Sequence, residues 1–191
     1  MVSVTEVKME FKLRNEESTD IKQVREILLA TFPREAESKL VDPLRANGKA
    51  IISLVAAASD NYVLGHILFS PVTTTPPSAA KGIGLAPVAV RPQVRSQGIG
   101  SGLIREGLRL CKELGYDYCV VLGNPKYYQR FGFEKASSFS LENEYGVDNE
   151  FMVIRFSNRG DMAHGLVKYA SESMHRSLRY FLFKKINIKI S

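Results

Sequence analysis

The apolar residues of the chain recur with two spacings, one typical of strands and one typical of helices. Period-two alternation or a short unbroken apolar run indicates a strand, and apolar positions three and four residues apart indicate a helix. The predicted strands are Met9–Arg14, Ile51–Ala58, Tyr62–Ser70, Ile83–Val90, Tyr116–Leu122, Phe133–Phe139 and Phe151–Phe156. The predicted helices are Asp20–Phe32, Arg34–Ala46, a run that ends at Leu114, and Asn124–Arg130. The helix that ends at Leu114 has its apolar side at Ile99, Leu103, Leu110, Cys111 and Leu114.

Local signals mark the ends of the first two helices. Ser18 or Thr19 can cap the first helix, because a hydroxyl accepts a hydrogen bond from a free N–H of the first turn. Proline lacks an N–H and restricts the residue before it, so Pro33 ends the first helix and Pro43 kinks or splits the second. The Asn47–Gly48 pair ends the second helix.

Between the later strands, turn residues predict the connections. Ser59–Asn61 joins two strands as a hairpin, and Gly65 within the second of them indicates a bulge or a close backbone approach. Thr73–Lys81, which contains two prolines and two alanines, is predicted to be a flexible surface loop. For the last segment, Gly165–Ser191, the sequence does not decide between helix, strand and a disordered terminus. A helix at Tyr169–Leu178 is one alternative.

The stretch Leu85–Leu122 contains an apolar strand, a glycine-rich loop, a helix and a second apolar strand. Neither strand alternates, so both faces of each are expected to be covered. A helix begins with unpartnered N–H groups and partial positive charge, which together bind anions. Gly98 and Gly100 lie at this point although each costs about 1 kcal/mol against alanine, and the absence of a Cβ suits close approach of a phosphate. With Arg95 as an added cation, the expected ligand is a diphosphate.

Two common nucleotide-binding loops do not match this loop. A P-loop needs Lys-Ser/Thr after its last glycine, where Ser101-Gly102 stands, and a dinucleotide fingerprint needs glycine where Leu103 stands. Arg95-Ser-Gln-Gly-Ile-Gly100 instead fits the pattern Gln/Arg-x-x-Gly-x-Gly/Ala. Together with Val88-Ala-Val-Arg-Pro92 before it and Tyr127-Tyr-Gln-Arg-Phe-Gly-Phe133 after it, this loop resembles the acyl-CoA pyrophosphate loop of the GNAT superfamily of N-acetyltransferases.

The resemblance covers Phe11 to Phe156 and implies an α/β GNAT (acyl-CoA N-acyltransferase) fold, with a mixed, mostly antiparallel central sheet of six to seven strands flanked by helices on both faces. It implies an acetyl-CoA-dependent N-acetyltransferase that moves an acetyl group to a primary amine by direct transfer in a ternary complex. Tyr128, which matches the family's Tyr-x-x-x-Gly-Phe segment, would be catalytic and protonate the departing thiolate. The residues that would bind acetyl-CoA (coenzyme A) are Val88, Ala89, Val90, Arg95, Ser96, Gln97, Gly98, Ile99, Gly100, Ser101, Asn124 and Tyr127.

Several of these residues also have plainer interpretations. Ser96 could cap the long helix, and Asn124 could cap the short helix that follows it. The side chains of Val88 and Val90 are expected in the core, so only their backbone groups would hold the cofactor. Tyr128 could be a packing residue whose hydroxyl reaches the surface.

No general base follows from the sequence. Many relatives place a glutamate on or near the fourth strand, but Leu85–Val90 contains no acid. A water chain would have to serve, or an acid from the second helix such as Glu35 or Glu37. The histidines, for which the sequence identifies no partner, are interpreted as structural or surface residues; they are His66, His164 and His175.

The composition supports one domain over residues 1–191, with a core at about 8–158 and a basic segment at 160–191. That segment has six basic and two acidic residues, or +4 of the net +6, so no nucleic-acid footprint over the whole domain is expected. No apolar run approaches the ~18 residues of a membrane span and the start does not resemble a signal peptide. Cys111 and Cys119 are predicted to be buried free thiols, and two cysteines and three histidines predict no metal site. A cytoplasmic location is expected.

The acceptor stays open between a small-molecule amine and a peptide or protein amine, because the N-terminal helices and the loop Glu142–Glu150 carry no signature. One alternative function is a non-catalytic module of the same fold that binds acyl-CoA as a regulatory ligand. Another is a nucleic-acid or membrane-surface protein that acts through Arg176–Lys189. The oligomeric state is expected to be a monomer or a homodimer.

Overall fold

The structure is a computed structural model that describes residues 10–32, 41–156 and 163–170. Its strands are β1 (Lys12–Asn15), β2 (Ile52–Ala57), β3 (Val63–Thr75), β4 (Gly82–Val90), β5 (Tyr118–Leu122), β6 (Glu134–Lys135), β7 (Leu141–Asn143), β8 (Phe151–Arg155) and β9 (Gly165–Tyr169). The α-helices are α1 (Ile21–Thr31), α3 (Val41–Ala46), α4 (Ile99–Glu113) and α5 (Pro125–Tyr128). Short 3-10 turns are η1 (Ser18–Asp20), η2 (Pro92–Val94), η3 (Gln129–Phe131) and η4 (Ala136–Phe139).

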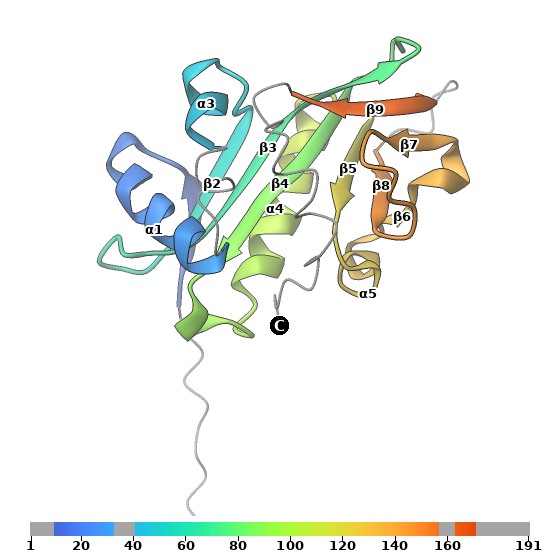
Figure 1. Cartoon of the computed structure of the whole chain (residues 1–191). Helices are drawn as coiled ribbons and strands as arrows, with labels where there is room; N and C mark the ends of the chain where they lie inside the picture. The colour runs from blue at the N-terminus through green and yellow to red at the C-terminus, as the bar shows by residue number, and fades with distance from the viewer. Residues whose placement is uncertain (1–9, 33–40, 157–162, 171–191) are drawn as a thin grey trace, which may run out of the picture.

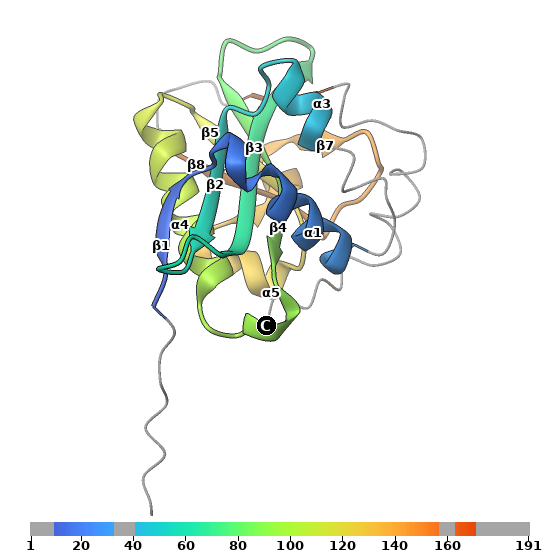
Figure 2. The ribbon, with the colours of Figure 1, turned by 90° about the vertical axis from the view of Figure 1, so that its left-hand side faces the viewer.

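These strands form one mixed sheet. The path across it is β1-β2-β3-β4-β5-β8-β6, and β9 pairs with both β3 and β7 beside this path. The β4–β5 and β7–β9 pairs are parallel and the others are antiparallel. Helix α4 lies on one side of the sheet, and α1 with α3 lies on the other (Figures 1 and 2). The predicted mixed, mostly antiparallel sheet with helices on both faces is confirmed, and its path of seven strands is extended by β7 and β9.

The period-two alternation of the strands divides the buried side chains between the two faces. Leu54 and Ala56 of β2 pack in the cluster that contains the apolar side of α4, and Val55 between them packs in the cluster that contains α1. Both clusters hold fully buried aliphatic side chains, each of which stabilises the fold by about 1.5–3 kcal/mol. The α4 face of the sheet and the α1 face are therefore separate cores with β2, β3 and β4 between them.

The pairing of β4 with β5 stops halfway along β4. The parallel register runs from Gly82 opposite Tyr118 to Leu85 opposite Val121 and continues no further. At the same point the β3–β4 register shifts, because Ile67 pairs with Val88 whereas Phe69 pairs with Leu85. The extra residue on β4 is a β-bulge, which bends a strand and increases its twist. Beyond the bulge, β4 has a strand neighbour among the described residues only on the β3 side.

Two glycines let α4 approach the sheet. A Cβ on Gly65 of β3 would lie 3.0 Å from Ile99 and 3.2 Å from Leu103, so the predicted close approach at Gly65 is confirmed. A register shift between β2 and β3 also falls next to Gly65, which confirms the predicted bulge. A Cβ on Gly107 of α4 would lie 2.2 Å from the buried ring of Phe69. Because Gly65 of β3 and Gly107 of α4 have no side chains, the helix can pack closely against the sheet.

Several predicted elements are wrong where distant pairing decides the outcome. Thr73–Thr75 belongs to β3 and pairs with β9, so the predicted loop Thr73–Lys81 begins only after Thr75. The predicted strand Phe133–Phe139 is reduced to β6 and the turn η4. The strands β7 and β9 were predicted as loop and as an undecided terminus, and β9 lies beyond the predicted core range.

Three local predictions at helix ends are also corrected. The turn that leads into α1 is closed by Glu17 and Asp20 rather than by Ser18 or Thr19, since the Glu17 N–H donates to Asp20 at 2.8 Å. Pro43 lies in the first turn of α3, where its missing N–H needs no partner. Leu114, predicted on the buried side of α4, is 56% exposed. The predicted helix residues from Arg34 to Leu40 lie outside the described residues.

Gly107→Ala is expected to destabilise the protein by up to about 2 kcal/mol, although alanine favours helix more than glycine. The overpacking cost of about 1–3 kcal/mol against Phe69 exceeds the helix gain of about 1 kcal/mol. Urea unfolding measures the difference. The matched control is Gly102→Ala in the same helix, where the nearest atom would be 3.6 Å away, and this change should stabilise by up to about 1 kcal/mol. Equal effects of the two changes would contradict the packing argument.

Candidate functional site

Helix α4 begins without a side-chain cap. Its N-cap is Gly98, which has a φ of 82° in the left-handed region, and no side chain caps the first turn. Gly102 makes the first intrahelical bond, to the Gly98 carbonyl at 2.8 Å. The N–H groups of Ile99, Gly100 and Ser101 are therefore left without intrahelical acceptors, at the positive end of the helix dipole. The interpretation of Ser96 as a helix cap is wrong.

A cavity of about 280 Å³ opens at this helix start. Its lining residues are Val90, Val94, Arg95, Ser96, Gly98, Ile99, Gly100, Ser101, Tyr127 and Arg130. All but Val94 and Arg130 were predicted from the sequence as cofactor-binding. Among the described residues the lining contains two arginines and no carboxylate, so free N–H groups and cations converge on one space. Such a space suits an anionic ligand.

Arg130, which was not predicted from the sequence, enters the cavity wall from η3. Its guanidinium carbon lies 4.3 Å from the centre of the Tyr127 ring, and its Nε donates to the Tyr127 carbonyl at 3.2 Å. The Tyr127 side chain is in turn hydrogen-bonded to Ser101, a contact that opposes the rise that burial causes in the Tyr127 pKa. The signal was available, because Arg130 follows Tyr127 by three residues on a short helical segment and so shares its side.

The bare edge of β4 adds a second feature to the site. Arg91 donates its N–H to Leu64 of β3 at 2.9 Å, and the groups of successive residues in a strand point to alternate sides. Ala89 therefore directs its backbone groups to β3, whereas Val88 and Val90 direct theirs to the side where β5 no longer pairs. The side chains of Val88 and Val90 are buried in the α4 core, as predicted. An extended ligand could hydrogen-bond to these backbone groups as an added strand.

Five predicted site residues do not line the cavity: Val88, Ala89, Gln97, Asn124 and Tyr128. Asn124 caps α5, because its side-chain oxygen accepts the Lys126 N–H at 3.0 Å. This capping interpretation was one of the two alternatives for Asn124.

Tyr128 is held in the α4 core, not at the surface. It is 4% exposed, and its ring lies 5.6 Å from that of Phe133 in an edge-to-face arrangement. A Cβ on Gly123, just after β5, would lie 2.1 Å from the Tyr128 ring, so glycine is needed there for the ring to reach this position. Burial raises the pKa of Tyr128 well above its ordinary value. The phenol therefore keeps its proton at neutral pH.

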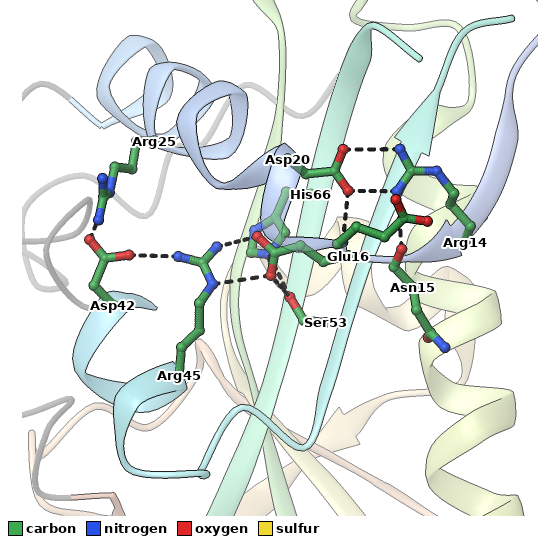
Figure 3. A network of polar contacts seen from close by, with 10 residues as sticks. Arg14, Asn15, Glu16, Asp20, Arg25, Asp42, Arg45, Ser53 and His66 are labelled. Atoms are coloured by element: carbon green, nitrogen blue, oxygen red, sulfur yellow. Dashed lines mark hydrogen bonds and ion pairs between the residues drawn. The ribbon is translucent and has the colours of Figure 1, made fainter.

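A buried polar cluster occupies the α1 face of the sheet, where the sequence indicated no site. Glu16, directly after β1, lies between the guanidinium of Arg45 on α3 and the hydroxyl of Ser53 on β2 (Figure 3). Ser53 also contacts His66 on β3, with 2.9 Å between its hydroxyl oxygen and Nε2. Burial opposes ionisation of Glu16, but the neighbouring His66 together with hydrogen bonds from Arg45 and Ser53 outweighs it and lowers the Glu16 pKa to about 2. His66 has partners after all.

The remaining predictions concern the cysteines, the candidate bases, the other histidines, metal sites and membrane spans. Cys111 and Cys119 are free and buried, as predicted, and burial raises the pKa of Cys111 to about 12. Glu35, Glu37 and His175 lie outside the described residues, and His164 is exposed. Within the described ranges no His, Cys, Asp and Glu side chains gather as a metal site, and no helix is long and apolar enough to cross a bilayer.

Comparisons with known proteins identify the family. A profile described as "Acetyltransferase (GNAT) family" matches residues 21–133. The chain is 36% identical over 159 residues to the Escherichia coli K12 protein named "Uncharacterized N-acetyltransferase YhbS", covering 82% of this chain and 95% of that protein. The chain therefore belongs to the GNAT acetyltransferase family, as its resemblance implied.

Two solved structures support the same family and fold. The E. coli YhbS crystal structure, in complex with CoA, has a TM-score of 0.80 and 34% identity, covering 88% of this chain and 94% of its own. A GNAT acetyltransferase from Brucella melitensis, in complex with acetyl-CoA, has a TM-score of 0.72 and 35% identity, covering 85% of this chain and 97% of its own.

The Glu16 cluster should make stability depend on pH in acid. Because the folded pKa of about 2 lies below the ordinary value of 4.5, Glu16 stabilises fully above pH 4.5 and loses this effect as pH falls toward 2. The loss is about 3 kcal/mol. Glu16→Gln should remove that part of the slope in urea unfolding series between these pH values. Glu113→Gln, at an exposed ion pair, should keep the wild-type slope; an unchanged slope in Glu16→Gln would contradict the assignment.

Proposed function

We propose that the protein is an acetyl-CoA-dependent N-acetyltransferase that passes the acetyl group directly to a primary amine in a ternary complex. The observation that carries this proposal is the uncapped start of α4 beside the bare edge of β4. The first feature suits a diphosphate and the second suits an amide-containing arm that lies like a strand. Family membership and the cofactors in the two solved relatives support the same ligand.

Binding divides between the two features. The pyrophosphate of CoA would accept hydrogen bonds from the N–H groups of Ile99, Gly100 and Ser101, with Arg95 and Arg130 supplying positive charge. The pantetheine amides would pair with the outward backbone groups of Val88 and Val90. This arrangement carries the thioester from the α4 start along β4 toward the point where β5 separates from it.

Transfer then needs a hydrogen-bond donor for the thioester carbonyl and an acid for the departing thiolate. Among these outward groups, the N–H of Val88 lies nearer than that of Val90 to the point where β5 separates, so we assign it to the thioester carbonyl and the other outward groups to the pantetheine amides; a donor aimed at a developing oxyanion lowers the barrier. Tyr128 would give its proton to the departing thiolate, since its phenol is protonated at neutral pH. A purely regulatory acyl-CoA module would need neither group.

Gly98→Glu should weaken acetyl-CoA binding by about 100-fold or more, or about 2.7 kcal/mol, because a carboxylate would occupy the anion site. Calorimetric titration with CoA measures the change. Gly115→Glu is the matched control, since Gly115 ends the same helix, also has a positive φ, and also has open space around its Cβ position. Both variants should lose similar stability, and only Gly98→Glu should lose affinity. Equal affinities would reject the anion-site assignment.

Tyr128→Phe should lower kcat by about 100-fold while leaving the Kd for acetyl-CoA within a few-fold, because only the proton donor is removed. Steady-state turnover of acetyl-CoA with a primary amine, scored as free thiol, measures this effect. Tyr127→Phe, which removes the hydroxyl bonded to Ser101 in the cavity wall, should act mainly on Kd. A wild-type kcat in Tyr128→Phe would remove Tyr128 from the mechanism, and a wild type that binds CoA but transfers to no amine in a broad panel would favour the regulatory module.

A further inference from the structure

The imidazole of His66 is fully buried and only half satisfied. Its Nε2 lies 2.9 Å from the Ser53 hydroxyl oxygen and 3.7 Å from the nearer oxygen of Glu16. Its Nδ1 has no hydrogen-bond partner among the described residues. Leaving a buried polar atom unpaired is costly, so a buried group of this kind calls for a bound water, a ligand or a chemical role.

The hydrogen-bond chain determines which nitrogen of His66 carries the proton. Glu16, with its lowered pKa, is ionised and can only accept. The single hydroxyl hydrogen of Ser53 therefore goes to Glu16, across 2.5 Å. Ser53 must then accept from His66, which places the proton on Nε2 and leaves a bare lone pair on Nδ1. The chain Glu16–Ser53–His66 presents a basic nitrogen.

Opposing charges around the ring keep that nitrogen free of a proton at rest. Burial lowers the pKa of His66, the carboxylates of Glu16 and Asp20 act against it, and the guanidinium of Arg45 acts with it. The side chains of Ala89 and Val55, which flank His66 in register on β4 and β2, are uncharged. His66 is therefore neutral at neutral pH, with Glu16 close enough to stabilise an imidazolium that forms transiently.

His66 lies on β3, one strand away from the bare edge of β4, and on the face of the sheet opposite Tyr128. His66 pairs with Ala89, and directly opposite residues share a face, so both lie on the α1 side, where Ala89 packs. Tyr128 belongs to the α4 core. Strands are about 4.8 Å apart, so a ligand along the bare edge would lie two spacings, or about 10 Å, from β3, a gap that a chain of about three hydrogen-bonded waters would span. Acid and base would thus flank the thioester from opposite sides of the sheet.

We propose that Nδ1 of His66 accepts the ammonium proton of the acceptor through bridging water, and that Ser53 and Glu16 are positioning residues that fix its tautomer. This inference rests on the proposed function and supplies the base that the sequence left unassigned. It implies an alkyl amine acceptor, which is protonated at neutral pH and must lose a proton before it can attack.

An N–H bond of the ammonium breaks, a proton moves along the water, and an Nδ1–H bond forms. The freed lone pair makes the C–N bond while the C–S bond breaks and Tyr128 protonates the sulfur. The second amine proton restores Tyr128, and the imidazolium releases its proton to solvent. The products are the amide, CoA thiol and one proton.

The kinetic test is the pH profile of kcat/KM for wild type and His66→Gln, with acetyl-CoA and an alkyl amine that the wild type acetylates. In wild type, activity should rise as His66 loses its proton, at a pH below the ordinary histidine value of about 6.5. In His66→Gln, kcat/KM at pH 7 should fall by about 100-fold or more. The rise should then move up to the pKa of the free amine, since only neutral amine reacts, while the Kd for acetyl-CoA should stay unchanged.

Matched variants separate chemistry from packing. Ser53→Ala removes the hydroxyl that orients the ring and should lower kcat while the Kd for acetyl-CoA stays constant. Asp42→Asn breaks ion pairs with Arg25 and Arg45 at the edge of the same cluster and should keep the wild-type pH profile. If His66→Gln lowers activity by one factor at every pH, or leaves it unchanged, the His66 assignment is overturned while the proposed function stands. A wild type that binds acetyl-CoA and acetylates no amine overturns both.

A second measurement does not depend on catalytic activity. Long-range proton–nitrogen NMR of the wild type, with the His66 signals assigned by their loss in His66→Gln, reports the tautomer directly. The proton should reside on Nε2 at pH 7, and the ring should titrate below pH 6.5. A proton on Nδ1, or a charged ring at pH 7, overturns the proposal.

Discussion

The loss of pairing between β4 and β5 after Leu85 is the constraint on which the other features of the site depend. A strand inside a sheet has no free backbone groups, so it can hold nothing but its neighbours. The bulge next to Leu85 separates β4 from β5 while β3 continues to support the other edge. The outward groups of Val88 and Val90 therefore face open space from a rigid position, beside a helix start whose own N–H groups are uncapped.

Three glycines allow the close packing on which this arrangement depends. Gly65 and Gly107 let α4 approach β3, which aims the first turn of the helix at the end of β4. Gly123 lets Tyr128 lie over the end of β5, where the strands diverge. At Gly107 and Gly123 a Cβ would collide with a buried ring, and at Gly65 it would crowd Ile99, so glycine leaves the space that these neighbours occupy. The site is assembled by packing on the α4 face, and the polar cluster of Glu16, Ser53 and His66 is assembled independently on the other face.

The local part of the site was readable from the sequence because its signals lie close together in the chain. The loop from Arg95 to Gly100, the helix after it and Tyr127 follow within one strand–helix–strand unit, and most of the cavity lining came from that unit. Arg130 was missed although it lies three residues from Tyr127. No partner of His66 was identified from the sequence, because Ser53 lies 13 residues before His66 and Glu16 lies 37 residues before Ser53. Only strand register brings the three side chains together.

By itself, the sequence determined most of the strands and helices, the glycine-rich loop before the long helix and the family, since periodicity, turn residues and a contiguous motif are all local properties. Only the tertiary structure decided that β3 continues through Thr75, because β9 supplies its partner from about ninety residues further on. It alone decided that Tyr128 is buried, that β4 is bare beyond Leu85, and that His66 meets an ionised carboxylate. Each of these depends on which distant segments share a sheet or a core, and that pairing has no signature within any one window of residues.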